Sequence, residues 1–189
     1  MTFGRLLLTP EDAQAPARLE RLRALGLGER PEPALDAVAQ RLADRLDVPY
    51  AAVNFVTPVH QFLAGRHPCA QPSTVRRTLP RDHGYCPYVV VRRKALVLED
   101  VRQFPRFATN PVVYQWGVLA YLGAPLMDGD GLALGTVCAA TREPRAWGGE
   151  GLDVVKTLAA ELGEELTREV PRAPAASTGA GGRSAHAGA

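Results

Sequence analysis

Few side chains in this sequence could do chemistry, and Cys86 is the best placed of them. It stands in the run His83-Gly84-Tyr85-Cys86-Pro87, where a helix is expected to begin. The helix dipole favours the thiolate of a cysteine at a helix N-terminus, so Cys86 is a candidate redox sensor. The alternative is a small buried side chain, because free cysteine is among the most buried residue types. Both interpretations of Cys86 are open at this point.

The other two cysteines look less reactive. Cys138 lies in the middle of an apolar strand, and we expect it to belong to the core. Cys69 follows Pro68 in a long loop, and we expect it to be exposed. Three cysteines without a C-x-x-C spacing argue against a disulfide framework and against a zinc site. The sequence therefore predicts free thiols and no metal centre.

A second group of polar side chains lies in the loop VRQFPRFATNP, which is punctuated by proline. Arg106 can pair with Asp100 through two hydrogen bonds and hold this loop, or it can point its guanidinium at an anionic ligand. Asn110 can cap a helix that begins at Pro111, a favoured first-turn position. Phe107 stands between them. This loop is a candidate wall of a pocket.

Two apolar runs follow, Ala120 to Met127 and Leu132 to Ala140, and both are predicted as strands. The Asp-Gly-Asp-Gly between them supplies the positive-φ positions that a hairpin turn needs. Tyr121 offers an apolar ring with a phenol tip at the rim of a pocket. Gly123 and Pro125 are best explained by backbone geometry, as a bend in the strand and an edge position.

These fragments resemble the GAF family of small-molecule sensor domains, in its bacterial branch. The motif R-F-x-x-N-P-x-V stands at 106–113, Y-x-G-x-P-L at 121–126, D-G at Gly129 or Gly131, and L-G-T-x-C at 134–138. The resemblance covers roughly residues 19–164. It implies an α+β fold with a central antiparallel sheet of about five to six strands. N- and C-terminal helices lie on one face, with pocket loops and short helices on the other.

The resemblance also implies which residues matter. The candidate ligand-binding residues are Cys86, Tyr85, Arg106, Phe107, Asn110 and Tyr121. The structural motif consists of Asp100, Gly123, Pro125 and Gly135. Departures from the family pattern occur at Leu119-Ala120, where Arg-Phe is common, and at Thr141, where Asp is common. Both remove charge near the pocket, so we expect an apolar pocket or one that has lost its ligand.

Periodicity predicts the remaining elements. The predicted helices are Glu11 to Leu27, Glu32 to Leu46, Gly84 to Arg92 capped by Asp82, and Glu150 to Val170. The predicted strands are Tyr50 to Val56, His60 to Gly65 and Leu96 to Glu99, with a long loop from Arg66 to Asp82. We expect an N-terminal extension at 1–18, a GAF domain at 19–168 and a disordered tail at 169–189, since the tail has too few large apolar residues to order.

Composition excludes several classes of protein. The formal charge is only +2, and its arginines are scattered without a basic block, so nucleic acid is not expected as a partner. No run approaches the roughly 20 apolar residues that span a bilayer. Met1 to Ala15 does not resemble a signal peptide. We therefore expect a cytoplasmic protein that does not enter a membrane.

The resemblance also brings activities that this sequence does not match. Methionine sulfoxide reduction in the family uses three thiols, but Leu96 and the stretch around Leu119 offer none. Bilin attachment uses a Cys that is usually followed by His, whereas Pro87 follows Cys86. Haem would need an axial ligand, for which the domain offers only His60, His67 and His83. We therefore predict no cofactor and no catalysis.

The function expected from the resemblance is that of a stand-alone bacterial GAF signalling protein. It would bind an unknown small molecule or a partner protein, such as a kinase or regulator, and pass its signal in trans. The terminal helices offer a surface for a homodimer. Two alternatives are open: a thiol-based redox sensor or small redox enzyme using Cys86, similar to a methionine sulfoxide reductase, and a degenerate GAF scaffold with no ligand.

Overall fold

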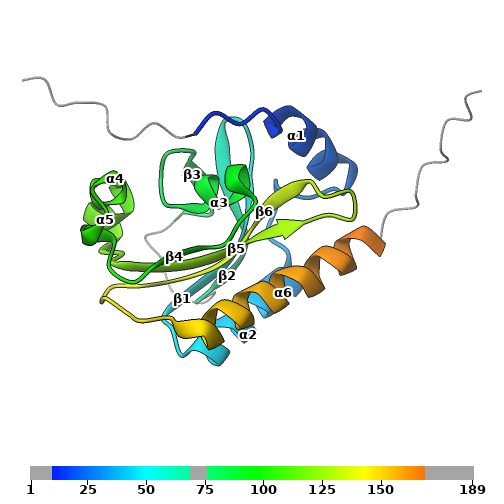
Figure 1. Ribbon diagram of the computed structural model, residues 1–189. Coiled ribbons are helices and arrows are strands. Elements are labelled where there is room, and N and C mark those ends of the chain that lie inside the picture. Colours follow the sequence, from blue (N-terminus) through cyan, green and yellow to red (C-terminus); the bar gives the residue numbers. More distant parts are fainter. Residues whose placement is uncertain (1–9, 69–75, 169–189) are drawn as a thin grey trace, which may run out of the picture.

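A six-stranded antiparallel sheet forms the centre of the molecule (Figure 1). The computed structural model describes residues 10–68 and 76–168. Its strands lie in the order β3-β2-β1-β6-β5-β4, and every neighbouring pair is antiparallel. They are β1 (Tyr50–Val56), β2 (His60–His67), β3 (Thr78–Pro80), β4 (Leu96–Leu98), β5 (Ala120–Met127) and β6 (Ala133–Thr141). The predicted α+β fold class is confirmed.

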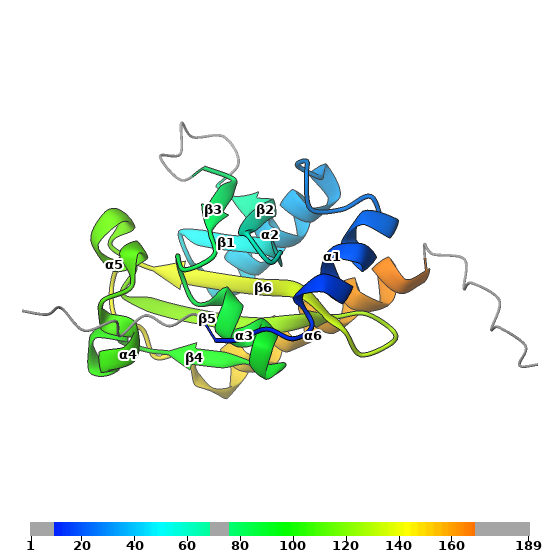
Figure 2. The ribbon, with the colours of Figure 1, turned by 90° about the horizontal axis from the view of Figure 1, so that it is seen from above.

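Helices cover both faces of the sheet, as Figures 1 and 2 show. On one face lie α2 (Pro33–Leu46) and α6 (Gly148–Arg168). On the other lie α3 (Cys86–Arg92), the 3-10 turn η1 (Val101–Gln103), α4 (Pro105–Ala108) and α5 (Pro111–Trp116). The first helix, α1 (Ala15–Ala24), sits at the end of the sheet beside the turn between β5 and β6. None of the described helices is long and apolar enough to cross a membrane.

Alternation along the strands separates two apolar cores. In β1, Val53 and Phe55 pack with α2 and α6, while Ala52 and Val56 pack with α3 on the opposite face. Because successive side chains of a strand point to opposite faces, the polar Asn54 shares the α3 face with Ala52 and Val56. The α3 face is the one that carries the site described below.

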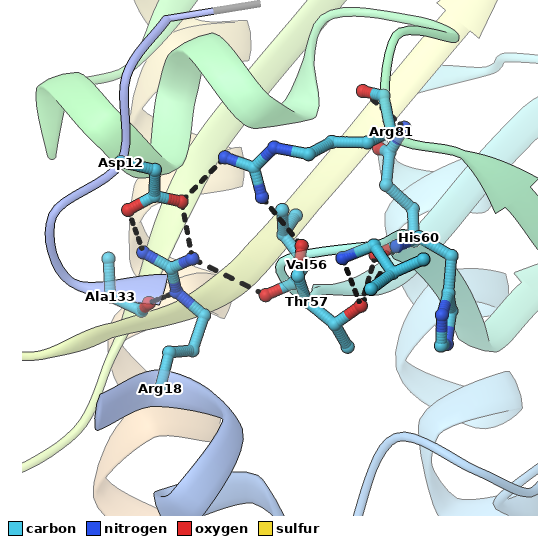
Figure 3. Close-up of polar contacts among 9 residues, drawn as sticks. Asp12, Arg18, Val56, Thr57, His60, Arg81 and Ala133 are labelled. Carbon is cyan, nitrogen blue, oxygen red and sulfur yellow. Dashed lines mark hydrogen bonds and ion pairs between the residues drawn. The ribbon is translucent and has the colours of Figure 1, made fainter. Parts of the chain in front are cut away.

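A buried charge cluster ties α1 to the sheet and to the segment before α3 (Figure 3). The Arg18 side chain is fully buried; its Nη1 lies 2.7 Å from Asp12 Oδ2, and its Nε donates to the Ala133 carbonyl. Arg81 also pairs with Asp12 at 2.7 Å and donates to the Thr57 carbonyl at 2.6 Å. Burial raises the pKa of Asp12, but hydrogen bonds from the two arginines outweigh it and leave that pKa lowered. Asp12 is thus held as a carboxylate between two guanidinium groups.

Most predicted elements are present, with local corrections. The expected cap of α3 by Asp82 is wrong: the helix begins at Cys86, its N-cap Tyr85 has no side-chain cap bond, and Asp82 contacts His83 instead. The long loop predicted at 66–82 contains the short strand β3. Residues 10–18 of the predicted extension contact the sheet through the Asp12 cluster. The expectations for Cys69 and for the tail at 169–189 lie outside the described residues.

Of the two alternatives for Arg106, its pairing with Asp100 is wrong. Asp100 binds Arg102 instead, at 2.7 Å, and its carboxylate accepts the Arg102 backbone N–H. Asp100 and Arg102 are only two positions apart, and the turn η1 brings them together. The Asp100 carboxylate is therefore paired locally and not with the more distant Arg106. Arg106 is exposed and lies over the Tyr88 ring, with its guanidinium carbon 5.0 Å from the ring centroid.

Candidate functional site

A cavity of about 150 Å³ lies on the α3 face of the sheet. Strands β1 and β6 form its floor, where Ala52 pairs with Cys138 and Asn54 with Thr136. The N-terminus of α3 brings Cys86 over this floor, and Tyr121 enters from β5. The remaining wall includes Trp116 of α5. An apolar cavity of about this volume can hold a ligand the size of one aromatic ring.

The two buried cysteines meet in this cavity. Cys86 Sγ lies 3.8 Å from Cys138 Sγ and 3.3 Å from the Tyr121 hydroxyl oxygen. Cys86 and Cys138 are only 6 % and 8 % exposed, yet both line the cavity. Cys138 is buried, as expected of a core residue. Its sulfur, however, also contacts the Cys86 thiol. This contact joins residues 52 positions apart in the sequence.

Hydrogen bonding separates the acidities of the two thiols. The hydrogen bond with Cys138, followed by those from Thr136, Tyr121 and Asn54, lowers the pKa of Cys86 against the opposing effect of burial. The same bond with Cys86, together with burial, raises the pKa of Cys138. The Thr136 hydroxyl has no other hydrogen-bond partner among the described residues, so it can serve a Cys86 thiolate. Cys86 therefore ionises first, while Cys138 stays a thiol.

Burial dominates at the neighbouring phenol. It raises the pKa of Tyr121 well above the ordinary value, and the two adjacent sulfurs raise it further. Tyr121 is therefore a neutral hydrogen-bond donor at neutral pH. Its ring also packs edge-on against Tyr85, with ring centroids 5.2 Å apart. Tyr121 thus holds a fixed place between the thiols and the aromatic wall.

A buried amide pair supplies a hydrogen-bond acceptor. Asn54 Nδ2 donates to Gln61 Oε1 at 2.9 Å, while Gln61 Nε2 donates to the carbonyls of Pro80, Arg81 and His83. These bonds fix the orientation of both amides. Asn54 Oδ1 is left buried without a hydrogen bond to any described residue. Because most buried polar atoms are paired and Asn54 lines the cavity, this oxygen is the candidate acceptor for a donor from a ligand.

Aromatic and cationic side chains frame the same cavity. Arg142 lies over the Tyr50 ring, with its guanidinium carbon 5.3 Å from the centroid. His83 and Trp116 have ring centroids 6.1 Å apart. All four line the cavity, and Arg142 is exposed. The interior is thus apolar with few polar groups, whereas the rim carries positive charge.

Three of the six candidate ligand-binding residues come together here: Cys86, Tyr85 and Tyr121 line the cavity. Arg106, Phe107 and Asn110 are not among its lining residues. Phe107 packs edge-on against Tyr85 and Tyr88 behind the wall. Arg106 lies on the surface beyond Tyr88.

Asn110 organises the approach to the cavity instead. It caps α5, as predicted, because its Oδ1 accepts the Val112 N–H. The same oxygen accepts the Gly84 N–H at 2.8 Å, and Nδ2 donates to the Gly84 carbonyl at 2.9 Å. Gly84 has a φ of 80°, which a glycine adopts without strain. Asn110 and Gly84 together set where α3 begins and so where Cys86 lies.

The framework residues have separate roles. Gly135 lies where a Cβ would approach the Asn54 carbonyl oxygen to 2.0 Å, so only glycine allows this strand contact. Pro125 is half-buried within β5. Asn54, Gln61 and Cys138 line the cavity but were not predicted as site residues. Two signals were available in the sequence. Asn54 is a polar residue inside the apolar run of β1, and Cys138 lies two positions after Thr136, on the same face of β6.

A second, larger hollow lies on the opposite face. It is an open groove of about 940 Å³ between α6 and the strands β4 and β5, with Val97, Leu152 and Lys156 among its lining residues. None of the predicted ligand-binding residues line it. Among the described residues, no three His, Cys, Asp or Glu side chains are grouped so that they could hold a metal ion. The buried polar groups and the thiol pair lie in the smaller cavity, which is therefore the candidate site.

Together, the layered fold and the cavity between α3 and the sheet define a GAF-type domain. The family model for the GAF domain matches residues 30–166, so this chain belongs to the GAF domain family. GAF domains are in general sensory or signalling domains.

Known proteins and structures resemble this chain over different lengths. A cyclic di-GMP phosphodiesterase from Pseudomonas aeruginosa is 37 % identical over 70 residues, which are 36 % of this chain and 12 % of that protein. The chain therefore matches only a small part of that relative. The GAF domain of a phosphoenolpyruvate-protein phosphotransferase from Coxiella burnetii has a TM-score of 0.60 and 20 % identity. That match covers 82 % of this chain and 96 % of the other.

A type II free methionine-R-sulfoxide reductase from Thermoplasma acidophilum has a TM-score of 0.57 and 14 % identity. It covers 79 % of this chain and 95 % of that chain. At these identities the two structural likenesses establish the fold alone. They bring neither a phosphotransferase partner nor a reductase activity to this protein.

Proposed function

We propose that this protein is a sensor whose α3-side cavity binds a small, mainly apolar molecule. The observation that carries the proposal is the buried Asn54 Oδ1, which has no hydrogen-bond partner among the described residues. A ligand with one N–H or O–H group would satisfy it. The apolar remainder of the ligand would contact Tyr121 and Trp116, and a polar or anionic substituent would reach Arg142 at the rim.

The volume of the cavity limits the class of ligand. Sites for drug-sized ligands usually measure roughly 300–1,000 Å³. A cavity of about 150 Å³ is smaller than that range and suits a single ring with one or two substituents. A cyclic dinucleotide, the substrate named for the Pseudomonas relative, would be too large. We therefore assign the site a compact metabolite in place of a nucleotide.

The signal would reach a partner protein in trans. The N-terminus of α3 contacts the ligand cavity, and Asn110 links it to α5. A ligand that moves Cys86 would therefore move the surface formed by α4 and α5, where Tyr114 is 75 % exposed. We propose this surface as the contact for a kinase or regulator. A homodimer through the terminal helices also stays a prediction, which light scattering over a range of concentrations would check.

A thermal-shift screen of small cyclic compounds tests the ligand site. Ala52 lines the cavity, so Ala52→Leu should fill it and abolish the shift given by any binding compound. Ala17 is exposed on α1, and Ala17→Leu is the matched control that should keep the full shift. A compound that stabilises the Ala52→Leu variant as much as the unaltered protein would place its binding elsewhere.

A further inference from the structure

The contact between Cys86 and Cys138 permits chemistry that ligand binding does not require. Their sulfurs are 3.8 Å apart. A disulfide needs a separation of about 2.05 Å, so the two atoms must approach by about 1.8 Å. Cys86 is the first residue of α3, and Cys138 lies within β6. The approach requires rotation of the side chains or a shift of the helix end.

The surroundings give the two thiols different roles. The Tyr121 hydroxyl lies 3.3 Å from Cys86 Sγ and can donate a hydrogen bond to it once Cys86 is ionised; together with Thr136 it stabilises the thiolate. Cys138 is kept protonated beside it. The thiolate is the nucleophile in cysteine oxidation, and a neighbouring thiol can resolve the product. The cavity that both residues line gives a small oxidant access to them.

We propose that Cys86 and Cys138 form a reversible intramolecular disulfide when a hydroperoxide enters the cavity. The Cys86 thiolate attacks the hydroperoxide, an S–O bond forms, and the O–O bond breaks. The departing alkoxide or hydroxide takes up the proton that Cys86 had released, which leaves a sulfenic acid. Cys138 then attacks this sulfur while its proton passes to the departing hydroxyl, so that the S–S bond forms, the S–O bond breaks and water leaves. One hydroperoxide is reduced by two electrons, and a cellular dithiol restores both thiols by exchange.

This inference goes beyond ligand sensing and concerns different atoms. It also differs from the three-thiol arrangement of the methionine sulfoxide reductases, because the resolving thiol comes from the L-G-T-x-C strand. The disulfide would tie the first residue of α3 to the floor of the cavity. Oxidation should therefore reduce the space available to the ligand, so that one cavity responds to two signals.

Mass spectrometry of the full chain tests the disulfide directly. A Cys69→Ser background leaves only Cys86 and Cys138 as thiols. After a small molar excess of hydrogen peroxide, alkylation under denaturing conditions should find both thiols protected. Digestion should then yield a linked peptide pair containing both residues, which a dithiol reductant separates. Free, alkylatable Cys86 and Cys138 under these conditions would overturn the proposal.

Single variants test the assigned roles. In Cys138→Ser, peroxide should leave Cys86 as a sulfenic acid that dimedone traps. In Cys86→Ser, Cys138 should react at least ten times more slowly. Equal rates for the two cysteines would overturn the assignment of Cys86 as the attacking thiol. Ligand binding by the double variant Cys86→Ser, Cys138→Ser is measured separately by thermal shift. Failure to form the disulfide is therefore distinguishable from failure of the proposed sensor function.

Discussion

The phenol of Tyr121 lies directly over Gly123, two residues along the same strand. A Cβ at residue 123 would come within 2.2 Å of the Tyr121 hydroxyl oxygen and 2.7 Å of Cζ. The ring is 4 % exposed and packs edge-on against Tyr85, so away from the cavity that it lines it has little room to move. The sequence interpretation explained Gly123 by a bend in the strand. The structure explains it by the space that Tyr121 needs to reach the Cys86 sulfur.

Gly123→Ala should therefore displace Tyr121 and destabilise the protein by about 1–3 kcal/mol, the range seen when a packed core is overfilled. Gly149 has open space where a Cβ would lie, so Gly149→Ala is the matched control and should change stability by less than about 1 kcal/mol. Urea denaturation followed by circular dichroism measures both. Equal stability of the two variants would contradict the close contact at Gly123.

Arg18→Met should destabilise the protein by about 3 kcal/mol, because it removes one of the two buried guanidinium partners of Asp12 and leaves only Arg81. The carbonyls of Ala133 and Val56 would also lose their donor. Arg23 is exposed on the same helix, and Arg23→Met should change stability by less than about 0.5 kcal/mol. The same denaturation experiment compares the two. A similar effect of both would mean that the buried cluster contributes nothing to stability.

The Asp12 carboxylate should make stability depend on pH. Its folded pKa lies below the ordinary value of 3.8, so its stabilising effect is present in full above that value. The effect is lost as the pH falls through the folded pKa. The difference in unfolding free energy between the unaltered protein and Asp12→Asn should therefore be larger at pH 7 than at pH 3. A difference that stays constant between these pH values would refute the assignment of Asp12 as an ionised partner.

Arg106→Ala should leave ligand binding unchanged, because Arg106 is exposed and does not line the cavity. Its contact with the Tyr88 ring is at the surface, so its loss should cost less than about 1 kcal/mol. Asn54→Ala is the informative comparison, since it removes the unpaired acceptor from the cavity. Calorimetry with a compound identified by thermal shift should find binding retained in the first variant and weakened in the second. The opposite order would restore Arg106 as a ligand contact.

Elements defined by nearby residues could be predicted from the sequence. Apolar runs gave Tyr50–Val56 and Ala120–Met127 with the bounds that the structure has, and Asn110 capped α5 as expected. Each of these depends on spacing within a short segment.

The partners of individual side chains could not be predicted in the same way. Whether Arg106 or Arg102 binds Asp100 depends on the geometry of one turn. Whether Cys138 meets Cys86 depends on strand pairing and on where Asn110 starts α3, across 52 positions of sequence. Such contacts are properties of the folded sheet, and only the alternation of β1 and β6 hinted at them.

Native mass spectrometry of the protein purified from its own host tests the proposed sensor site most directly. The unaltered protein should carry a compact non-covalent ligand, released on denaturation and identifiable by its mass. The Ala52→Leu variant should carry none, and Ala17→Leu should carry as much as the unaltered protein. The α3-side ligand site would be contradicted if the unaltered protein, expressed at its natural level, carried no ligand. It would also be contradicted if all three proteins carried the same amount of ligand.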